Sequence, residues 1–435
     1  MKEVKRMSTS NAVPAGSQGL VELDQQFVIH PHQVVGEPAV PIVITRAQGS
    51  TLWDSDGNEY LDGTCGLWQC AVGHGREELA QAAFEQMRSM EFYASFWDYS
   101  NEPSIRLAAR LAELAGDGLT HVHFTSGGSE GNAVAIKLAR LAFDTAGQPE
   151  RNVVLARRGA YHGSGSGASL WATGLPATQE GFGPPAEGFV HLSTPHAGRV
   201  NTDALIEELR DTIDRIGPER IAAFIGEPIM GVAGVLPPPA DYWPRVADVL
   251  HEHGILLIFD EVITAFGRLG HWFAFQRFGV TPDMVVTAKA LTSGYQPMGA
   301  VLVGDRPLAL LKGRMLRHGI TYNGHPVAAA VALKNLEIIE REGLLDCVLD
   351  RGAQLEAGLR ALESRPAVTE VRGEGLMWAV ELRSADAEQL ARAIRRRGVI
   401  VRGMLDRIVV SPPFVVTKAE IDRLIDTITA EVDAL

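Results

Sequence analysis

Short apolar runs alternate with longer stretches of helical periodicity through the middle of the chain, and this alternation limits the folds that it can adopt. Strands are predicted over Val122–Phe124, Asn152–Ala156, Ile221–Gly226, Ile255–Phe259, Met284–Thr287 and Ala300–Val303. Helices are predicted between most of them, over Ser129–Thr145, Asp203–Ile216 and Tyr242–His253. Strands separated by helices favour a largely parallel sheet with both faces covered. Because ligands bind at the carboxyl ends of such strands, the chemistry is expected just after these runs.

The sequence on either side of this region has a different texture. Three short strand-like runs begin near Val40, and helices are predicted over Arg76–Met90 and Pro103–Ala115. Beyond Gly324 come long helices, short strands and a last helix that opens with the capping box Thr417–Glu420. We therefore expect a disordered extension over residues 1–20, the first part of a small domain over 21–75, a large domain over 76–325 and a smaller α+β domain over 326–435.

Composition and charge exclude several classes of protein. The 435 residues are 46% hydrophobic, which is enough for a sizeable core, and 40 basic against 53 acidic residues give a net charge of −13. An acidic chain without a basic block is a poor candidate for binding nucleic acid or an anionic membrane, and no apolar run approaches the roughly 20 residues of a membrane span. Three scattered cysteines fit a reducing cytoplasm, and Cys65 and Cys70 lack the further ligands of a metal site.

Two polar segments that follow predicted strands could bind an anionic, aromatic ligand. Thr125–Asn132 is rich in glycine and lies between a strand and a helix, so backbone N–H groups near Gly128 and Ser129 could hold a phosphate. A plain turn with Ser129 as the helix cap is the alternative. Tyr161, after the next strand, could stack on a planar ring, or could simply be an aromatic residue of the core or rim.

Two further strand ends carry charged side chains. Asp260 and Glu261 follow a fully apolar strand, where a carboxylate could pair with a protonated ring nitrogen or could cap the next helix. Lys289 follows another apolar strand, where desolvation would lower its pKa and make its amine nucleophilic; a surface lysine is the alternative. A phosphate cradle, a stacking aromatic, a carboxylate and a nucleophilic lysine are together the groups that hold pyridoxal phosphate.

The chain resembles the class III aminotransferases, which have the fold type I of pyridoxal-phosphate enzymes. Eight motifs carry the resemblance in family order: LDGTCGLWQCAVGHG, SGGSEGNAVAIKLAR, AYHG, GEPIMGVAGV, DEVITAFGRLG, AKALTSGYQPMGAV, HGITYNGHPVAAAVA and VVSPPFVVTKAEID. The resemblance implies an α/β fold, with a mostly parallel central sheet in a large domain and a smaller α+β domain. It also implies a homodimer, with a tetramer left open, whose active site lies at the subunit interface.

The resemblance also assigns roles to single residues. It implies that Lys289 forms a Schiff base with pyridoxal phosphate and later moves a proton, and that Asp260 pairs with the pyridine nitrogen. The other residues implied to contact the cofactor are Gly128, Ser129, Tyr161, Glu227, Val262 and, from the neighbouring subunit, Thr321. Trp68, Tyr161 and Arg402 are implied to contact the substrate, with Arg407 as the second candidate because Leu405 replaces a frequent glycine in this loop.

We therefore predict a cytoplasmic aminotransferase that acts on small molecules by a ping-pong mechanism. It would move an amino group from an ω-amino acid or amine to a keto acid such as pyruvate. Another class III reaction, by an aminomutase, a decarboxylase or an epimerase, would use the same cofactor site. A non-catalytic protein of the same fold is the third possibility, and the presence of Lys289 and Asp260 argues against it.

Overall fold

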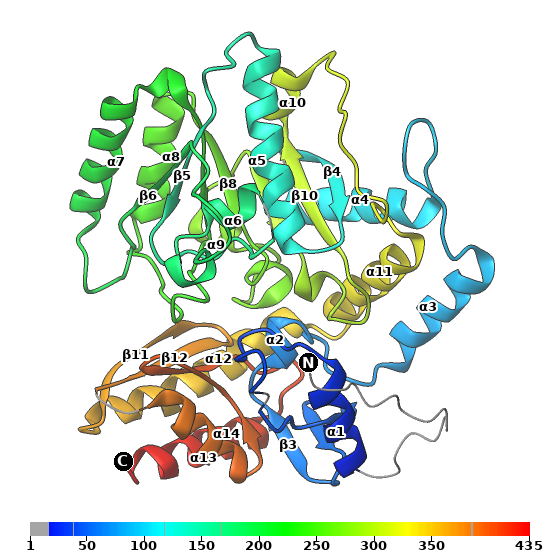
Figure 1. Ribbon diagram of the computed structural model, residues 1–435, viewed down its shortest axis with the longest axis vertical. Coiled ribbons are helices and arrows are strands. Elements are labelled where there is room, and N and C mark those ends of the chain that lie inside the picture. The colour runs from blue at the N-terminus through cyan, green and yellow to red at the C-terminus, as the bar shows by residue number, and fades with distance from the viewer. Residues whose placement is uncertain (1–16, 38, 117, 166, 384–385) are drawn as a thin grey trace, which may run out of the picture.

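The computed structural model describes residues 17–37, 39–116, 118–165, 167–383 and 386–435 (Figure 1). A large sheet with its helices forms the upper part of the molecule in Figure 1, and two smaller sheets with the C-terminal helices form the lower part. The upper part contains seven strands in the order β4-β10-β9-β8-β7-β5-β6. Their bounds are Leu119–Thr125 (β4), Val153–Arg157 (β5), Phe189–Leu192 (β6), Ile221–Gly226 (β7), Leu256–Asp260 (β8), Met284–Thr287 (β9) and Gly299–Gly304 (β10).

Six of the seven strands run in one direction, and β10 pairs antiparallel with both of its neighbours. Successive residues of each strand point to opposite faces, so every strand contributes to two cores. On β8, Leu257 packs with α7 and α8 on one face, whereas Ile258 packs with α5 on the other. The helices of the upper part are α3 (Glu77–Ser89), α4 (Glu102–Ala115), α5 (Gly128–Thr145), α6 (Ala168–Ala172), α7 (Thr202–Ile216), α8 (Tyr242–Glu252), α9 (Ala274–Phe278) and α10 (Asp305–Leu311).

The lower part contains two four-stranded sheets. One has the order β1-β2-β3-β13, with β1 at Ile44–Gln48, β2 at Thr51–Asp54, β3 at Glu59–Asp62 and β13 at Val399–Ile400. The other has the order β11-β12-β15-β14, with β11 at Val368–Glu374, β12 at Met377–Leu382, β14 at Arg402–Met404 and β15 at Arg407–Val410. Pairing of β13 with β3 joins the two ends of the chain in one sheet.

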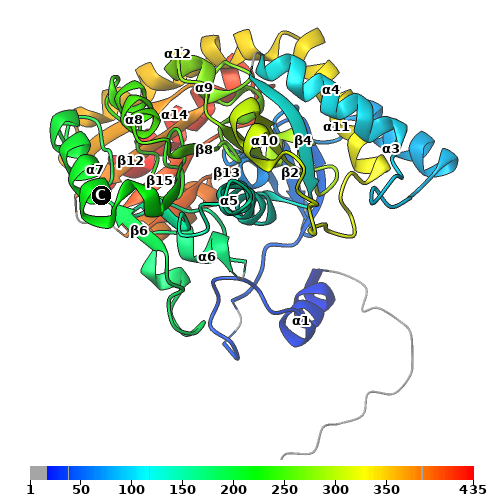
Figure 2. The ribbon, with the colours of Figure 1, turned by 90° about the horizontal axis from the view of Figure 1, so that it is seen from above.

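Six helices remain in the part of the chain that the structure describes, and all of them except α1 cover these sheets or connect the two parts. They are α1 (Ser17–Phe27), α2 (Cys65–Trp68), α11 (Pro326–Arg341), α12 (Leu344–Arg360), α13 (Ala387–Arg396) and α14 (Lys418–Val432). Short 3-10 turns span Pro176–Thr178, Pro218–Arg220, Ala265–Gly267, Lys289–Leu291 and Ala361–Ser364. In the view from above, α1 lies apart from the body of the molecule (Figure 2).

The structure agrees with most of the predicted elements and differs at three places. β7 and β9 have the predicted bounds, and α14 begins with the predicted capping box at Thr417. A disordered extension was predicted over residues 1–20. Residues 1–16 of it lie outside the described residues, and residues 17–20 are helical rather than disordered. β10 runs against its neighbours, and β6 and β13 were not predicted as strands because they are short or lack a fully apolar run.

Candidate active site

The carboxyl ends of the parallel strands surround a cavity of about 300 Å³. It lies where the loops after β5, β7, β8 and β9 meet the first turn of α5, which is the edge at which the strand pattern places the chemistry. Seven of the predicted site residues line this cavity: Gly128, Ser129, Tyr161, Glu227, Asp260, Val262 and Lys289. Residues more than 150 positions apart in the sequence are therefore brought together by the sheet.

Asp260 is the last residue of β8, and its carboxylate is held by three donors. Oδ2 accepts hydrogen bonds from Asn132 Nδ2 at 2.7 Å and His162 Nδ1 at 2.8 Å, and Oδ1 accepts one from the backbone N–H of Val262 at 3.1 Å. The residue is only 4% exposed. Because a buried carboxylate is costly unless it is hydrogen-bonded, these donors replace the water that it loses and fix its orientation toward the cavity.

Lys289 begins the short turn that follows β9, and its backbone adopts φ +44°. A left-handed conformation is unfavourable for a long side chain, and such strained residues cluster at functional sites. Burial lowers the pKa of the Lys289 amine to about 8, and the nearby carboxylates of Asp260 and Glu227 oppose this effect. The side chain can therefore present a neutral, nucleophilic amine near pH 8.

Glycine at positions 128 and 163 allows neighbouring groups to pack closely around the first turn of α5. A Cβ atom on Gly128 would lie 2.8 Å from the side chain of Val262, and one on Gly163 would lie 2.4 Å from Oγ of Ser129. The first N–H groups of an 18-residue helix have no helical partners, and the helix dipole adds positive charge there. Backbone N–H groups and the Ser129 hydroxyl at this point therefore fit a phosphate group.

Tyr161 and Glu227 form one unit of the cavity wall. The backbone N–H of Tyr161 donates to Oε1 of Glu227 at 3.0 Å, and that of Gly231 donates to Oε2 at 2.8 Å. Burial raises the pKa of the Glu227 carboxyl. Glu227 thus fixes the main chain at the aromatic residue that was predicted to pack on the ring.

Two arginines near the C-terminus have different environments. Arg402 is half-buried at the start of β14. Burial lowers the pKa of its guanidinium, and the neighbouring Tyr161 opposes this effect in part. Within the part of the chain that the structure describes, no carboxylate pairs with the Arg402 guanidinium. Arg407, the second candidate, instead donates to the backbone oxygen of Ala233 at 2.6 Å and pairs with Asp406.

Three predicted site residues do not line the cavity of this single chain: Arg402, Trp68 and Thr321. Trp68 is 3% exposed and packs among apolar residues such as Ile229 and Ile263, whereas its neighbour Leu67 lines the cavity. Trp68 has φ +65°, so the strained turn points it into the core, a direction that the sequence pattern does not reveal. Thr321 is exposed in the segment between α10 and α11.

Two polar residues at the site, Asn132 and His162, were not assigned by the sequence. Asn132 and His162 hold Asp260, and each has a further buried polar atom, Oδ1 and Nε2, without a partner among the described residues. Both lie inside motifs that carry the resemblance, which is the signal that could have found them. Glu261 points away from the cavity and accepts hydrogen bonds from the first backbone N–H groups of α9, so it acts as the helix cap.

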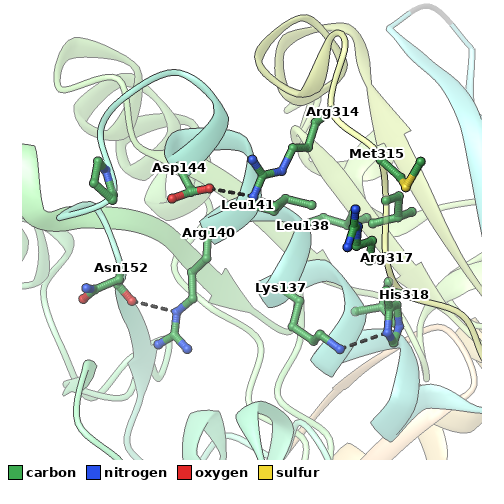
Figure 3. A pocket seen from close by; sticks show the side chains of 13 residues that line it. Lys137, Leu138, Arg140, Leu141, Asp144, Asn152, Arg314, Met315, Arg317 and His318 are labelled. Carbon is green, nitrogen blue, oxygen red and sulfur yellow. Dashed lines mark hydrogen bonds and ion pairs between the residues drawn. The ribbon is translucent and has the colours of Figure 1, made fainter.

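A larger cavity, of about 780 Å³, lies outside this site between α5 and residues 314–318 (Figure 3). Its lining side chains are mostly cationic or apolar, and Arg314 pairs with Asp144, the one acid among its described lining residues. Lys137 contacts His318 at 2.9 Å. Among the described residues that line this cavity, no nucleophile is paired with a carboxylate, so it does not compete as the catalytic site.

Comparison with known proteins decides the family. Residues 33–432 match the family model of class-III aminotransferases. The chain is 42% identical to a putrescine–pyruvate aminotransferase from Pseudomonas aeruginosa, over 88% of each chain, and 38% identical to a mitochondrial gamma aminobutyrate transaminase from Solanum lycopersicum, over 88% of this chain and 80% of the relative. The chain is a class III aminotransferase.

Solved structures support the same assignment for the fold. This aminotransferase superposes with a TM-score of 0.93 on a thermostable (S)-enantioselective omega-transaminase from Thermomicrobium roseum, at 46% identity over 96% of this chain and 99% of that one. An omega transaminase from Pseudomonas jessenii in complex with PMP also gives 0.93, at 36% identity over 95% and 98% of the two chains. The predicted family and fold class are confirmed.

Among the described residues, no helix is long and apolar enough to cross a membrane. In the same residues, no group of three or more His, Cys, Asp or Glu side chains is placed to hold a metal ion.

Proposed function

We propose that this aminotransferase moves an amino group from an ω-amino acid or a primary amine to a keto acid such as pyruvate, with pyridoxal phosphate bound at Lys289. The observation that carries the proposal is the shared cavity of Lys289 and Asp260, with the Gly128–Ser129 cradle beside them. These groups fit the cofactor because they offer an amine for its aldehyde, a carboxylate for its ring nitrogen and N–H groups for its phosphate. The names of the relatives, which include putrescine and gamma-aminobutyrate as donors, support the substrate class.

The residues of this chain would divide the work as follows. Bound pyridoxal phosphate supplies an electrophilic carbonyl for the amino donor and a ring that accepts electrons when the Cα–H bond of the donor breaks. Asp260, fixed by Asn132 and His162, holds the proton at the ring nitrogen. The Lys289 amine removes the proton from the donor Cα, which its lowered pKa favours near pH 8. Tyr161 and Val262, which both line the cavity, would pack on the ring and limit the access of water to it.

The activity is tested with the purified protein, pyridoxal phosphate and a panel of amino donors. Putrescine, 4-aminobutyrate and a simple monoamine are each offered with pyruvate or 2-oxoglutarate, and the alanine or glutamate formed is measured. Parallel lines in double-reciprocal plots are expected, because the first product leaves before the acceptor binds. Without an acceptor, each site should release one carbonyl product and stop. Release of CO₂, or isomerisation of the donor without a keto acid, would instead assign one of the other class III reactions.

We infer that the enzyme is a homodimer whose interface includes the face around Thr321. Apolar side chains are exposed on this face: Trp97 is 89% exposed, Met315 70% and Tyr322 60%. The ring of Phe92 lies 5.9 Å from that of Tyr322, so the segments around residues 92–97 and 315–322 form one continuous surface. A contiguous apolar surface of this kind is typical of a protein–protein interface. The free cysteines, Cys65, Cys70 and Cys347, support a cytoplasmic location.

Mixing inactive chains tests whether Thr321 serves the partner's site. The Lys289→Ala and Thr321→Ala variants are each expected to be inactive alone. They are purified separately, mixed and allowed to exchange subunits. A mixed dimer would then have one site with both lesions and one complete site, so random exchange should restore about a quarter of the wild-type activity. Exchange without recovery would show that Thr321 does not act across the interface.

A further inference from the structure

The tip of the loop that follows Glu227 is hydrogen-bonded to the sheet β11-β12-β15-β14, which we call the C-terminal sheet. Residues 230–236 form a small hairpin, closed by antiparallel backbone hydrogen bonds between Met230 and Leu236. Three consecutive backbone oxygens at its tip accept hydrogen bonds from two guanidinium groups. Arg407 Nη1 donates to Ala233 O at 2.6 Å, and Arg372 Nε donates to the oxygens of Gly234 and Val235 at 3.0 and 3.1 Å.

Both arginines are fixed within their own sheet. Arg372, on β11, is 5% exposed, and its Nη1 donates to Glu381 at 2.6 Å and Glu370 at 3.1 Å. Arg407, on β15, pairs with Asp406. The hairpin tip and the arginines therefore meet as two preformed surfaces, one of carbonyl dipoles and one of charged donors.

The tip of the hairpin adopts a backbone that it would not adopt alone. Val235 has φ +53°, which is unfavourable for a β-branched residue, and Gly234 has φ +104°. A Cβ atom on Gly234 would lie 2.4 Å from Cδ of Arg407, so only glycine allows the guanidinium to approach. Strain of this kind persists where surrounding contacts determine the conformation. Here the contacts are the apolar packing of the Val235 side chain and the hydrogen bonds from the two arginines to the backbone.

The root of the same hairpin is bound to the catalytic cavity. Gly231 donates its N–H to Oε2 of Glu227 at 2.8 Å and accepts, through its oxygen, the N–H groups of Gly234 and Val235 at 3.0 and 3.1 Å. The other carboxylate oxygen of Glu227 accepts the N–H of Tyr161 at 3.0 Å. An unbroken series of hydrogen bonds thus runs from the C-terminal sheet to the main chain of Tyr161.

We propose that Arg372 and Arg407 are positioning residues that set the Tyr161 wall of the cavity through the 230–236 hairpin and Glu227. Neither arginine lines the cavity. They hold the hairpin, the hairpin holds Gly231 against one oxygen of Glu227, and the other oxygen holds Tyr161. The consequence for catalysis rests on the proposed function, in which Tyr161 packs on the cofactor ring, but the mechanical link exists in the protein without cofactor.

Amide hydrogen exchange of the cofactor-free protein tests this link. Arg407→Gln removes the charged donor to Ala233, and Arg365→Gln is the matched control, because Arg365 pairs with Asp433 and contacts neither the hairpin nor the cavity. Peptides covering residues 158–165 and 228–236 are compared. Arg407→Gln should raise exchange in both peptides, by on the order of tenfold at the Tyr161 and Gly231 amides, and the control should change neither. Faster exchange confined to the hairpin peptide would overturn the proposal.

A second variant reaches the same contact from the other side. Gly234→Ala places a methyl group where Arg407 lies, so it should reproduce the exchange pattern of Arg407→Gln with the arginine intact. Arg407→Lys, which keeps one charged donor, should restore part of the protection at Tyr161. If Gly234→Ala leaves the Tyr161 amide unchanged while it loosens the hairpin, the link is refuted even if Arg407→Gln does not fold.

The loaded enzyme separates this inference from the proposed function. With the wild-type enzyme active, Arg407→Gln should shift the visible absorption of the bound cofactor and lower kcat for the amino donor more than it changes KM for pyruvate. A wild-type protein that fails to transaminate would refute the proposed function and leave the exchange result standing. An active wild type together with an unperturbed Tyr161 amide in the variants would refute only the role of the two arginines.

Discussion

The Lys289 amine of the cofactor-free protein should react with electrophiles at a pH at which an ordinary lysine is inert. Burial lowers its pKa to about 8 from the ordinary value of 10.5. A pKa of about 8 leaves about one amine in ten neutral at pH 7, against about one in 3000 for an ordinary lysine, so the reactive fraction differs on the order of 300-fold. Only the neutral amine is nucleophilic, and the labelling rate follows this fraction.

Asp260→Asn is the perturbation that tests the cause of the shift. Asp260 is the strongest influence that opposes burial, because its negative charge stabilises the ammonium form. Its removal should lower the pKa of Lys289 further and speed labelling at pH 7, with a ceiling of about tenfold because the neutral fraction cannot exceed one. Asp144→Asn, which removes a surface carboxylate paired with Arg314, is the control and should change nothing at Lys289.

Competitive labelling with trace acetic anhydride between pH 6 and 11 measures these rates, with the Lys289 peptide quantified by mass spectrometry against a free-amine standard. The wild-type midpoint should lie near pH 8 and should fall in Asp260→Asn. The same pKa has a consequence for stability: the unfolded chain binds an extra proton between about pH 8 and 10.5, so stability should rise with pH through this range, and Lys289→Met should abolish the rise. A labelling midpoint near 10.5, or equal shifts in both aspartate variants, would refute the reasoning.

Three further substitutions address the other walls of the site. In the loaded enzyme, Asp260→Asn should lower kcat by roughly 10²–10³ without unfolding the protein, measured as alanine formation, because one charge-assisted contact at the reacting centre is lost. Gly128→Ala places a Cβ 2.8 Å from Val262 and should weaken cofactor binding by roughly tenfold or more, measured by equilibrium dialysis; the same overpacking should cost the cofactor-free protein about 1–3 kcal/mol and lower its melting temperature by a few degrees. Arg402→Ala should raise KM for pyruvate by on the order of tenfold and leave KM for a simple monoamine nearly unchanged; equal effects on both would show that Arg402 does not bind the acceptor carboxylate.

Local signals were sufficient to predict the elements that carry the site. β9 is buried on both faces and consists of the apolar run 284–286 followed by Thr287, and the residue after its end, Ala288, leads directly to Lys289. The capping box at Thr417 fixes the start of α14 through contacts within four residues. In each case the information lies within a few neighbours, so a pattern in the sequence can contain it.

Contacts between distant segments could not be predicted in the same way. Arg407 and Arg402 are five residues apart in a similar sequence environment. Arg407 binds the backbone oxygen of residue 233, whereas Arg402 has no carboxylate partner among the described residues. Trp68 is turned into the core by a strained turn in which Gly66 and Trp68 both have positive φ. Periodicity gives the face of an element on which a residue lies, but it does not give the direction of a side chain in a loop.

The adjacent acids Asp260 and Glu261 show the difference between what a local sequence pattern predicts and what contacts with distant segments decide. The sequence allowed either a partner for a ring nitrogen or a helix cap, and in the structure Glu261 is the helix cap whereas Asp260 lines the cavity. Glu261, fully buried, accepts the N–H groups of Ala274 and Phe275 at 2.6 and 2.8 Å, and burial raises its pKa to about 7. Because successive side chains at the end of a strand point to opposite sides, only one of the two can face the cavity. Capping α9 fixes Glu261 on the far side, and this in turn leaves Asp260 to face Lys289.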